Sequence, residues 1–140
     1  MATATTVLFP WSETYCTKIG MVDTQHKKLV DLINELHQAM ITRTGKERLG
    51  KILSELVKYT EAHFKAEEGI LQANQYPDFV NHKAEHERFA NTVLEFQEKF
   101  GRNELGLTIE LMEFLKDWLS KHILTVDKKY VPFLNAKGVH

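Results

Sequence analysis

Residues 79–100 read FVNHKAEHERFANTVLEFQEKF, and one set of side chains in this stretch recurs at alternating spacings of three and four positions. This spacing is typical of a helix that packs with one face inside a helical bundle. The set consists of Phe79, His82, His86, Phe89, Val93, Phe96 and Phe100. His82 and His86 are therefore predicted to point inward, one turn or about 6 Å apart along the axis. Two inward histidines at this spacing indicate a metal ion, because imidazole nitrogen is a common metal ligand.

The composition is that of one ordinary globular domain. The chain has 140 residues, of which 43% are hydrophobic and 26% charged, and its formal net charge is −1. This balance gives no indication of nucleic-acid binding, and no apolar run reaches the roughly 18–20 residues that span a bilayer. The first seven residues do not resemble a secretory signal, and the single cysteine, Cys16, excludes an intrachain disulfide and a thiolate-rich metal site. We therefore expect a cytoplasmic protein.

Three other segments carry the same helical periodicity as residues 79–100. The predicted helices span about residues 23–43, 46–73 and 77–100, and the fourth begins near Leu107 and runs beyond His122. Asp23 is a candidate N-cap for the first helix, and Pro77 suits the first turn of the third. Short connections between successive helices predict an all-α, up-down-up-down four-helix bundle in residues 23–140. Residues 1–22 form an N-terminal arm that packs on this bundle, and a short C-terminal tail follows Pro132.

Seven inward polar side chains are predicted to meet in one layer of this bundle. In an up-down-up-down bundle, the start of the first and third helices lies at the same end as the finish of the second and fourth. The inward polar residues concentrate at that end. They are His26, His63, Glu67, His82, His86, His122 and Asp127. We therefore expect all seven to act as metal ligands.

Five imidazoles and two carboxylates suit a pair of metal ions. Two octahedral ions that share two bridging carboxylates and one solvent oxygen would each receive three oxygen ligands. The five imidazoles would then fill all but one of the remaining positions, and one position would stay open. This mixture of nitrogen and oxygen ligands is typical of iron, whereas a single tetrahedral zinc ion would leave several of these groups unused.

His122 and Asp127 lie five positions apart, which is an unusual spacing for two ligands of one site. On a regular α-helix this separation places the second side chain about 140° away from the first. Both residues can face the same site only if the helix widens locally. The sequence therefore predicts a π-bulge or a break between His122 and Asp127.

These motifs together resemble the ligand set of the hemerythrins. The matching residues are His26, His63-x-x-x-Glu67, His82-x-x-x-His86 and His122-x-x-x-x-Asp127, in that order. The sequence around them agrees as well: Trp11, residues 23–27 (DTQHK), His63-Phe64, Glu85 and residues 118–119 and 122–123 (WL and HI). The resemblance covers nearly the whole chain, whose length is similar to that of a bacterial hemerythrin.

The resemblance implies a non-haem centre of two iron ions, joined by an oxo or hydroxo bridge, that binds O2 reversibly. One iron would be held by His82, His86 and His122. The other would be held by His26 and His63 and would keep the open position, while Glu67 and Asp127 would bridge the two. Apolar residues within one turn of these ligands are candidates for the wall of an O2 pocket, although each also fits plain core packing. They are Phe64, Trp118, Leu119 and Ile123.

The ligand set favours an O2-binding protein over an enzyme. Ferritin-like di-iron oxidases use four carboxylates and two Glu-x-x-His motifs, and no histidine of this chain has a glutamate three positions before it. We therefore expect an oxygen carrier, a store or a supplier to an oxygen-consuming enzyme. The alternatives are a module that senses O2, NO or iron, and a di-iron enzyme that acts on peroxide or NO. The sequence does not determine the oligomeric state, and it is compatible with a monomer.

Several polar residues near the predicted ligands receive a structural interpretation. His37 lies too far along its helix from His26 to reach the same metal, so it is expected at the edge of the core. Glu68 and Glu85 neighbour predicted ligands but fall on other helical faces, so we expect them to be solvated. Tyr130, three residues beyond Asp127, is expected to pack near the site.

Overall fold

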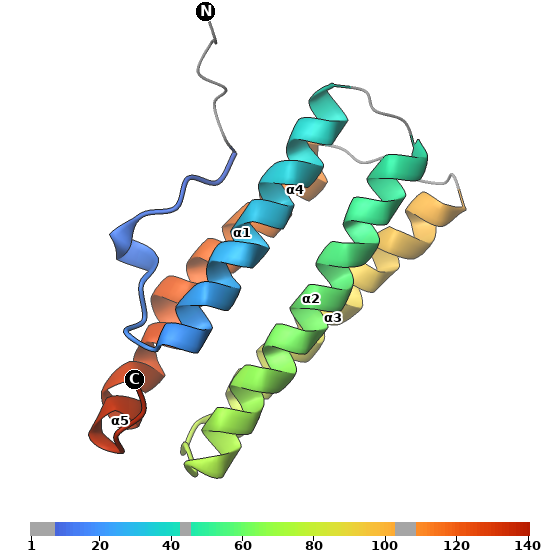
Figure 1. The fold of residues 1–140 in the computed structure, drawn as a ribbon. Coiled ribbons are helices and arrows are strands. Elements are labelled where there is room, and N and C mark those ends of the chain that lie inside the picture. The colour runs from blue at the N-terminus through green and yellow to red at the C-terminus, as the bar shows by residue number, and fades with distance from the viewer. Residues whose placement is uncertain (1–7, 43–45, 103–108) are drawn as a thin grey trace, which may run out of the picture.

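The computed structural model describes residues 8–42, 46–102 and 109–140, and every regular element in these ranges is helical. The elements are the short 3-10 turn η1 (Glu13–Tyr15), α1 (Gly20–Ile41), α2 (Lys46–Ala73), α3 (Phe79–Gly101), α4 (Ile109–Lys121), the π-helical segment η2 (His122–Asp127) and α5 (Lys128–Ala136). Because α4, η2 and α5 follow one another without a gap, they form one long helical rod beside α1, α2 and α3 (Figure 1). The predicted all-α four-helix bundle is confirmed.

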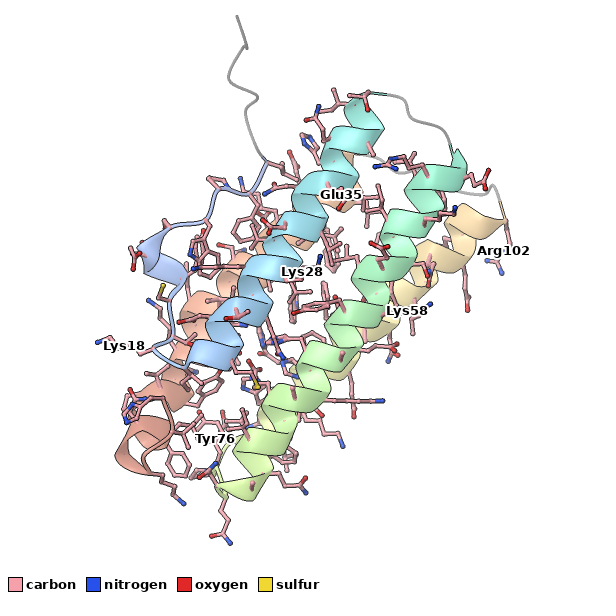
Figure 2. The ribbon with its side chains drawn as sticks, viewed as in Figure 1. Lys18, Lys28, Glu35, Lys58, Tyr76 and Arg102 are labelled. Atoms are coloured by element: carbon pink, nitrogen blue, oxygen red, sulfur yellow. The ribbon has the colours of Figure 1, made fainter. Side chains whose placement is uncertain are left out.

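The bundle contains two apolar clusters with a polar layer between them. The larger cluster fills most of the length of the bundle and includes Phe64 of α2, whereas the smaller one holds Leu71 of the same helix. Glu67 lies between these two positions and is itself buried. The exposed charged residues, by contrast, lie on the outer faces, as Lys28, Glu35 and Lys58 do (Figure 2). A buried layer of polar side chains between two apolar clusters requires partners for its donors and acceptors.

The described part of the arm is fixed to the bundle by a buried ring and by backbone hydrogen bonds. Phe9 is fully buried in the larger apolar cluster. Its backbone N–H donates to Oδ1 of Asn34 on α1 (2.8 Å), and its carbonyl accepts from Nδ2 of the same side chain (2.9 Å). Asn34 thereby satisfies both backbone groups of a residue that has no strand or helix partner.

Three helix ends differ from the sequence-based prediction. First, α1 begins at Gly20 rather than after Asp23, because Asp23 Oδ1 accepts hydrogen bonds from the backbone and hydroxyl of Thr17 (2.7 and 2.8 Å) instead of capping the helix. Second, α3 begins at Phe79, because the N–H of Tyr76 bonds back to the carbonyl of Leu71 and places Pro77 in the turn.

Third, α5 continues through Pro132 to Ala136, so the tail is shorter than expected. Burial of Tyr130 and Leu134 on either side of the proline, at 0% and 1% exposure, stabilises this last helix despite the missing N–H. None of the helices in the described ranges is both long and apolar enough to cross a membrane.

Candidate metal centre

The seven predicted ligands come together between α1, α2, α3 and the rod formed by α4, η2 and α5. His26 comes from α1, His63 and Glu67 from α2, His82 and His86 from α3, and His122 and Asp127 from η2. All seven side chains are buried, and none is more than 5% exposed. The ligand atoms form two groups. In the first, one atom from each of Glu67, His82, His86, His122 and Asp127 lies within 4.8 Å of the others, and in the second the same holds for His26, His63 and Glu67.

The two carboxylates lie between the histidine groups, and each directs one oxygen to each group. Oε1 of Glu67 lies 2.6 Å from Nε2 of His82 and 3.2 Å from Nε2 of His86, while Oε2 lies 3.6 Å from Nε2 of His63. Asp127 repeats this arrangement. Its Oδ1 lies 3.0 Å from Nε2 of His122, and its Oδ2 lies 3.1 Å from Nε2 of His26. Both carboxylates therefore have the orientation that a bridging ligand needs.

The π-helical segment makes the contribution of Asp127 possible. Residues His122–Asp127 form the predicted wide turn, which brings the side chains at its first and last positions onto the same side. As a result, the carboxylate of Asp127 lies against the ring of His122 rather than pointing away from the centre. The predicted irregularity between these two residues is confirmed.

Several buried polar atoms in the centre lack a hydrogen-bond partner. They are both ring nitrogens of His26 and both carboxylate oxygens of Asp127. In addition, the Nε2 atoms of His86 and His122 face each other at 3.0 Å, where at most one can carry a proton. Buried polar atoms without partners are costly. Lone pairs of imidazole and carboxylate that converge in this way fit a metal site, because a cation would satisfy them together.

The electrostatics of the protein alone keep the two carboxylates ionised. Burial and the nearby Asp127 each act to raise the pKa of Glu67, but hydrogen bonds from His82 and His86 outweigh them and lower it to about 2. The pKa of Asp127 also lies well below its usual value, because His122, His26 and His82 outweigh the effect of burial. Two anions in a buried layer attract cations.

The pKa values of two histidines in the centre shift in opposite directions. Burial lowers the pKa of His63 to about 4, since Glu67 offsets only part of the desolvation. Burial also acts to lower the pKa of His82, but the adjacent carboxylates of Asp127 and Glu67, 3.2 and 2.6 Å from its Nε2, raise it to about 10. A metal ion that binds His82 at neutral pH must therefore displace a proton.

Three polar residues that face the outer nitrogens of the histidines were not predicted from the sequence. Oε2 of Glu68 lies 2.8 Å from Nδ1 of His86, and Oε2 of Glu85 lies 3.5 Å from Nδ1 of His122. Oε1 of Gln25 lies 2.7 Å from Nδ1 of His63. The expectation that these glutamates are solvated was wrong for Glu68, which is 18% exposed, whereas the Glu85 side chain is 37% exposed and its Oε2 makes no hydrogen bond. Each directly adjoins a ligand in sequence, so it lies about 100° around the helix, where it faces a neighbouring helix.

Two further expectations concern Tyr130 and His37. Tyr130 is fully buried, and its hydroxyl donates a hydrogen bond to Oε2 of Glu67 (2.9 Å), so its predicted place near the site is confirmed. His37 is half-buried and belongs to neither ligand group, as expected for a residue at the edge of the core.

A small apolar cavity lies next to the ligands. Its volume is about 10 Å³, close to the minimum that holds one water molecule. Its lining residues are Leu29, Ile33, Leu56, Thr60, Phe64, Phe89, Leu115, Trp118 and Leu119. Three of the four predicted pocket residues are among them. Ile123 is not, although it is fully buried in the larger apolar cluster.

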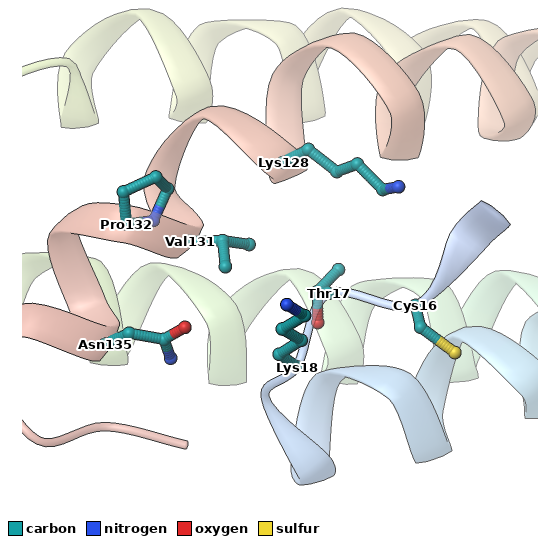
Figure 3. Close-up of a pocket in the computed structure, with 7 residues that line it drawn as sticks. All are labelled: Cys16, Thr17, Lys18, Lys128, Val131, Pro132 and Asn135. Atoms are coloured by element: carbon teal, nitrogen blue, oxygen red, sulfur yellow. The ribbon is translucent and has the colours of Figure 1, made fainter. Parts of the chain in front are cut away.

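Aromatic rings connect this cavity to the ligand histidines. The Phe64 ring stacks on the His86 ring with centroids 3.7 Å apart, and the Trp118 ring stacks on the His122 ring at 4.4 Å. A larger surface pocket of about 330 Å³ lies elsewhere, between residues 16–18 of the arm and Lys128, Val131, Pro132 and Asn135 of α5 (Figure 3). None of the candidate metal ligands lines that pocket.

Known proteins are similar to this chain in sequence and in fold. The family model described as hemerythrin HHE cation binding domain matches residues 17–134. A bacteriohemerythrin of Methylococcus capsulatus is 38% identical over 92% of this chain and 98% of its own length. A hemerythrin-like protein of Naegleria gruberi is 32% identical over 93% of this chain and 97% of its own. A crystal structure of wild-type hemerythrin superposes with a TM-score of 0.85 at 37% identity, covering 89% of this chain and 96% of that one. These are not the names of enzymes, in agreement with the non-enzymatic function expected from the sequence.

Proposed function

Because this chain belongs to the hemerythrin family, we propose that it binds O2 reversibly at a non-haem centre of two iron ions. The observation that carries the proposal is the orientation of the two buried carboxylates. Glu67 and Asp127 each direct one oxygen to the three-histidine group and the other to the two-histidine group. Two groups of ligands that share two carboxylates suit a pair of ions better than a single ion.

The histidines divide unequally between the two positions. His82, His86 and His122 would hold one iron, and His26 and His63 would hold the other, so the two-histidine side has one protein ligand fewer and would have room for O2. A ferrous pair held in this way would supply the electrons for reversible binding of O2.

The apolar cavity next to the ligands provides a dry environment for a small gas molecule. Phe64, Trp118 and Leu119 contribute to its wall. The one hydroxyl among its lining residues, that of Thr60, donates to the backbone carbonyl of Leu56 (2.7 Å) and is therefore not free to donate a proton into the cavity. A wall of this kind excludes water and stray protons, which favours release of O2 over irreversible oxidation.

A chain that binds O2 and releases it unchanged would serve as an oxygen carrier, a store or a supplier to an oxygen-consuming enzyme. A cytoplasmic location and an oxygen-consuming enzyme as the recipient are predictions from the sequence.

The proposal is tested by metal analysis together with cycles of gas exchange. Purified protein should contain two iron ions per chain. After anaerobic reduction it should become coloured in air and bleach under argon over repeated cycles. A chain with no iron pair, or one that oxidises once and does not bleach, would contradict the proposal.

A further inference from the structure

The outer nitrogens of the ligand histidines have unequal hydrogen-bond acceptors. All five histidines direct Nε2 toward Glu67 or Asp127 in the centre, which leaves Nδ1 for an outer partner. In the three-histidine group, two of these nitrogens face carboxylates, at 2.8 Å for His86 and 3.5 Å for His122. In the two-histidine group, Nδ1 of His63 faces the neutral amide of Gln25, and the buried Nδ1 of His26 has no hydrogen-bond partner.

The nature of the acceptor changes how strongly a histidine donates electrons to its metal. A ring that binds a metal through Nε2 carries its proton on Nδ1 and donates it to the outer acceptor. A carboxylate accepts this hydrogen bond about twice as strongly as a neutral group does, and it makes the ring a more basic ligand. Glu68 provides such a contact to His86. Glu85 lies farther from its histidine and therefore contributes mainly through its charge.

Burial strengthens the effect of Glu68. Its side chain is only 18% exposed, compared with 37% for Glu85. On the other side of the contact, the Phe64 ring covers the His86 ring at a centroid distance of 3.7 Å and keeps water from that face. A charge interaction with little intervening water is less screened than one at the surface.

We propose that Glu68, assisted by Glu85, makes the three-histidine side of the centre richer in electrons than the two-histidine side and lowers the reduction potential of the metal pair. Both glutamates are positioning residues, since they act through His86 and His122. This inference rests on the proposed di-iron function. It adds that the carboxylates facing the outer histidine nitrogens, and not the ligand set alone, determine how easily the centre oxidises.

The test compares the midpoint potential of four iron-loaded proteins by anaerobic spectroelectrochemical titration. Glu68→Gln keeps an oxygen acceptor for His86 but removes the charge. We expect it to raise the midpoint potential, with the ratio of oxidised to reduced protein changing about tenfold at a fixed potential, or about 59 mV for a one-electron step. Gln25→Glu adds a charge beside His63 and should shift the potential in the opposite direction.

A matched control separates the outer contact from general surface charge. Glu87 is exposed and adjoins His86 in sequence, so Glu87→Gln removes the same charge from the same turn and should leave the midpoint nearly unchanged. A purely structural role for Glu68 also predicts no shift, because glutamine can accept the same hydrogen bond. If Glu68→Gln does not retain iron, Gln25→Glu provides the test with the opposite sign.

The outcomes distinguish this inference from the proposed function. A wild-type chain without an iron pair would overturn both. A wild-type chain that holds two iron ions and binds O2, with midpoints that do not move in Glu68→Gln and Gln25→Glu, would overturn only the inference. Opposite shifts in these two variants, with no shift in Glu87→Gln, would support it.

Discussion

Replacing Tyr130 by phenylalanine removes one hydroxyl from the centre of the protein and leaves the packing of the ring in place. That hydroxyl donates to Oε2 of Glu67 (2.9 Å), and both side chains are at most 1% exposed. The next polar atoms around this oxygen, Nε2 of His63 at 3.6 Å and Nε2 of His26 at 3.8 Å, are too distant to replace the lost bond. The variant therefore leaves a buried anionic oxygen without a hydrogen bond in the metal-free protein.

The expected cost follows from the charge on the acceptor. Hydrogen bonds to charged groups contribute about 1.5–3 kcal/mol, and an unsatisfied buried acceptor costs a similar amount. We therefore expect Tyr130→Phe to lower the free energy of unfolding of the metal-free protein by about 2 kcal/mol. For a domain of this size the unfolding midpoint should fall by about 6 °C.

The assay is urea denaturation of the metal-free protein, followed by circular dichroism, with Tyr76→Phe as the control. The Tyr76 ring contacts that of Tyr130, with centroids 6.2 Å apart, but Tyr76 is only half-buried. Loss of its hydroxyl should change the stability by less than about 0.5 kcal/mol. If Tyr130→Phe costs no more than Tyr76→Phe, the hydroxyl does not stabilise Glu67, and the reasoning is refuted.

Three further predictions concern the open position, the cavity and the pH dependence. His26→Ala should abolish O2 binding while the far-ultraviolet circular dichroism spectrum stays helical; retained O2 binding would show that the open position lies elsewhere. Leu119→Asn buries an amide in the apolar cavity and should cost about 1–3 kcal/mol of stability and speed irreversible oxidation in air, measured by the loss of colour change between air and argon. Leu119→Met nearly conserves the side-chain volume, so it should change the stability and the oxidation rate only slightly. In the metal-free protein, the raised pKa of His82, about 10, contributes stability that is fully present below the unfolded value near 6.5 and is lost as pH rises through 10. Urea midpoints should therefore fall more steeply between pH 8 and 10 in the wild type than in His82→Asn, and equal slopes would contradict the assigned pKa.

The convergence of the seven candidate ligands could be predicted because it depends on local rules and on simple topology. Helical periodicity determines which side chains share a face, and the alternation of helix directions determines which of them lie at the same level. The π-helical segment was predictable for the same reason, since the spacing of His122 and Asp127 conflicts with a regular helix.

Contacts that depend on how neighbouring helices are rotated could not be predicted from one sequence. The contact of Glu68 with His86 joins α2 to α3, and the contact of Gln25 with His63 joins α1 to α2. Periodicity placed Glu68 outside the central face correctly, but it gave no information about the helix that this side chain meets. The start of α1 was misplaced for a related reason, because the carboxylate of Asp23 binds Thr17 of the arm.

The residues that line the cavity were likewise predicted only in part. Phe64, Trp118 and Leu119 were identified by their distance along the helix from a ligand, and all three line it. Ile123 satisfies the same criterion but is not part of the lining. The cavity includes Leu29 and Ile33 of α1, so its position depends on packing across the bundle as well as on spacing within one helix.

The central claim is that Glu67 and Asp127 are shared by two iron ions, and anomalous X-ray diffraction at the iron absorption edge tests it most directly. Crystals of the iron-loaded protein should show two anomalous peaks per chain. One should lie among His82, His86 and His122 and the other beside His26 and His63, each bonded to one oxygen of both carboxylates. A single peak, or two peaks that do not share Glu67 and Asp127, would contradict the account.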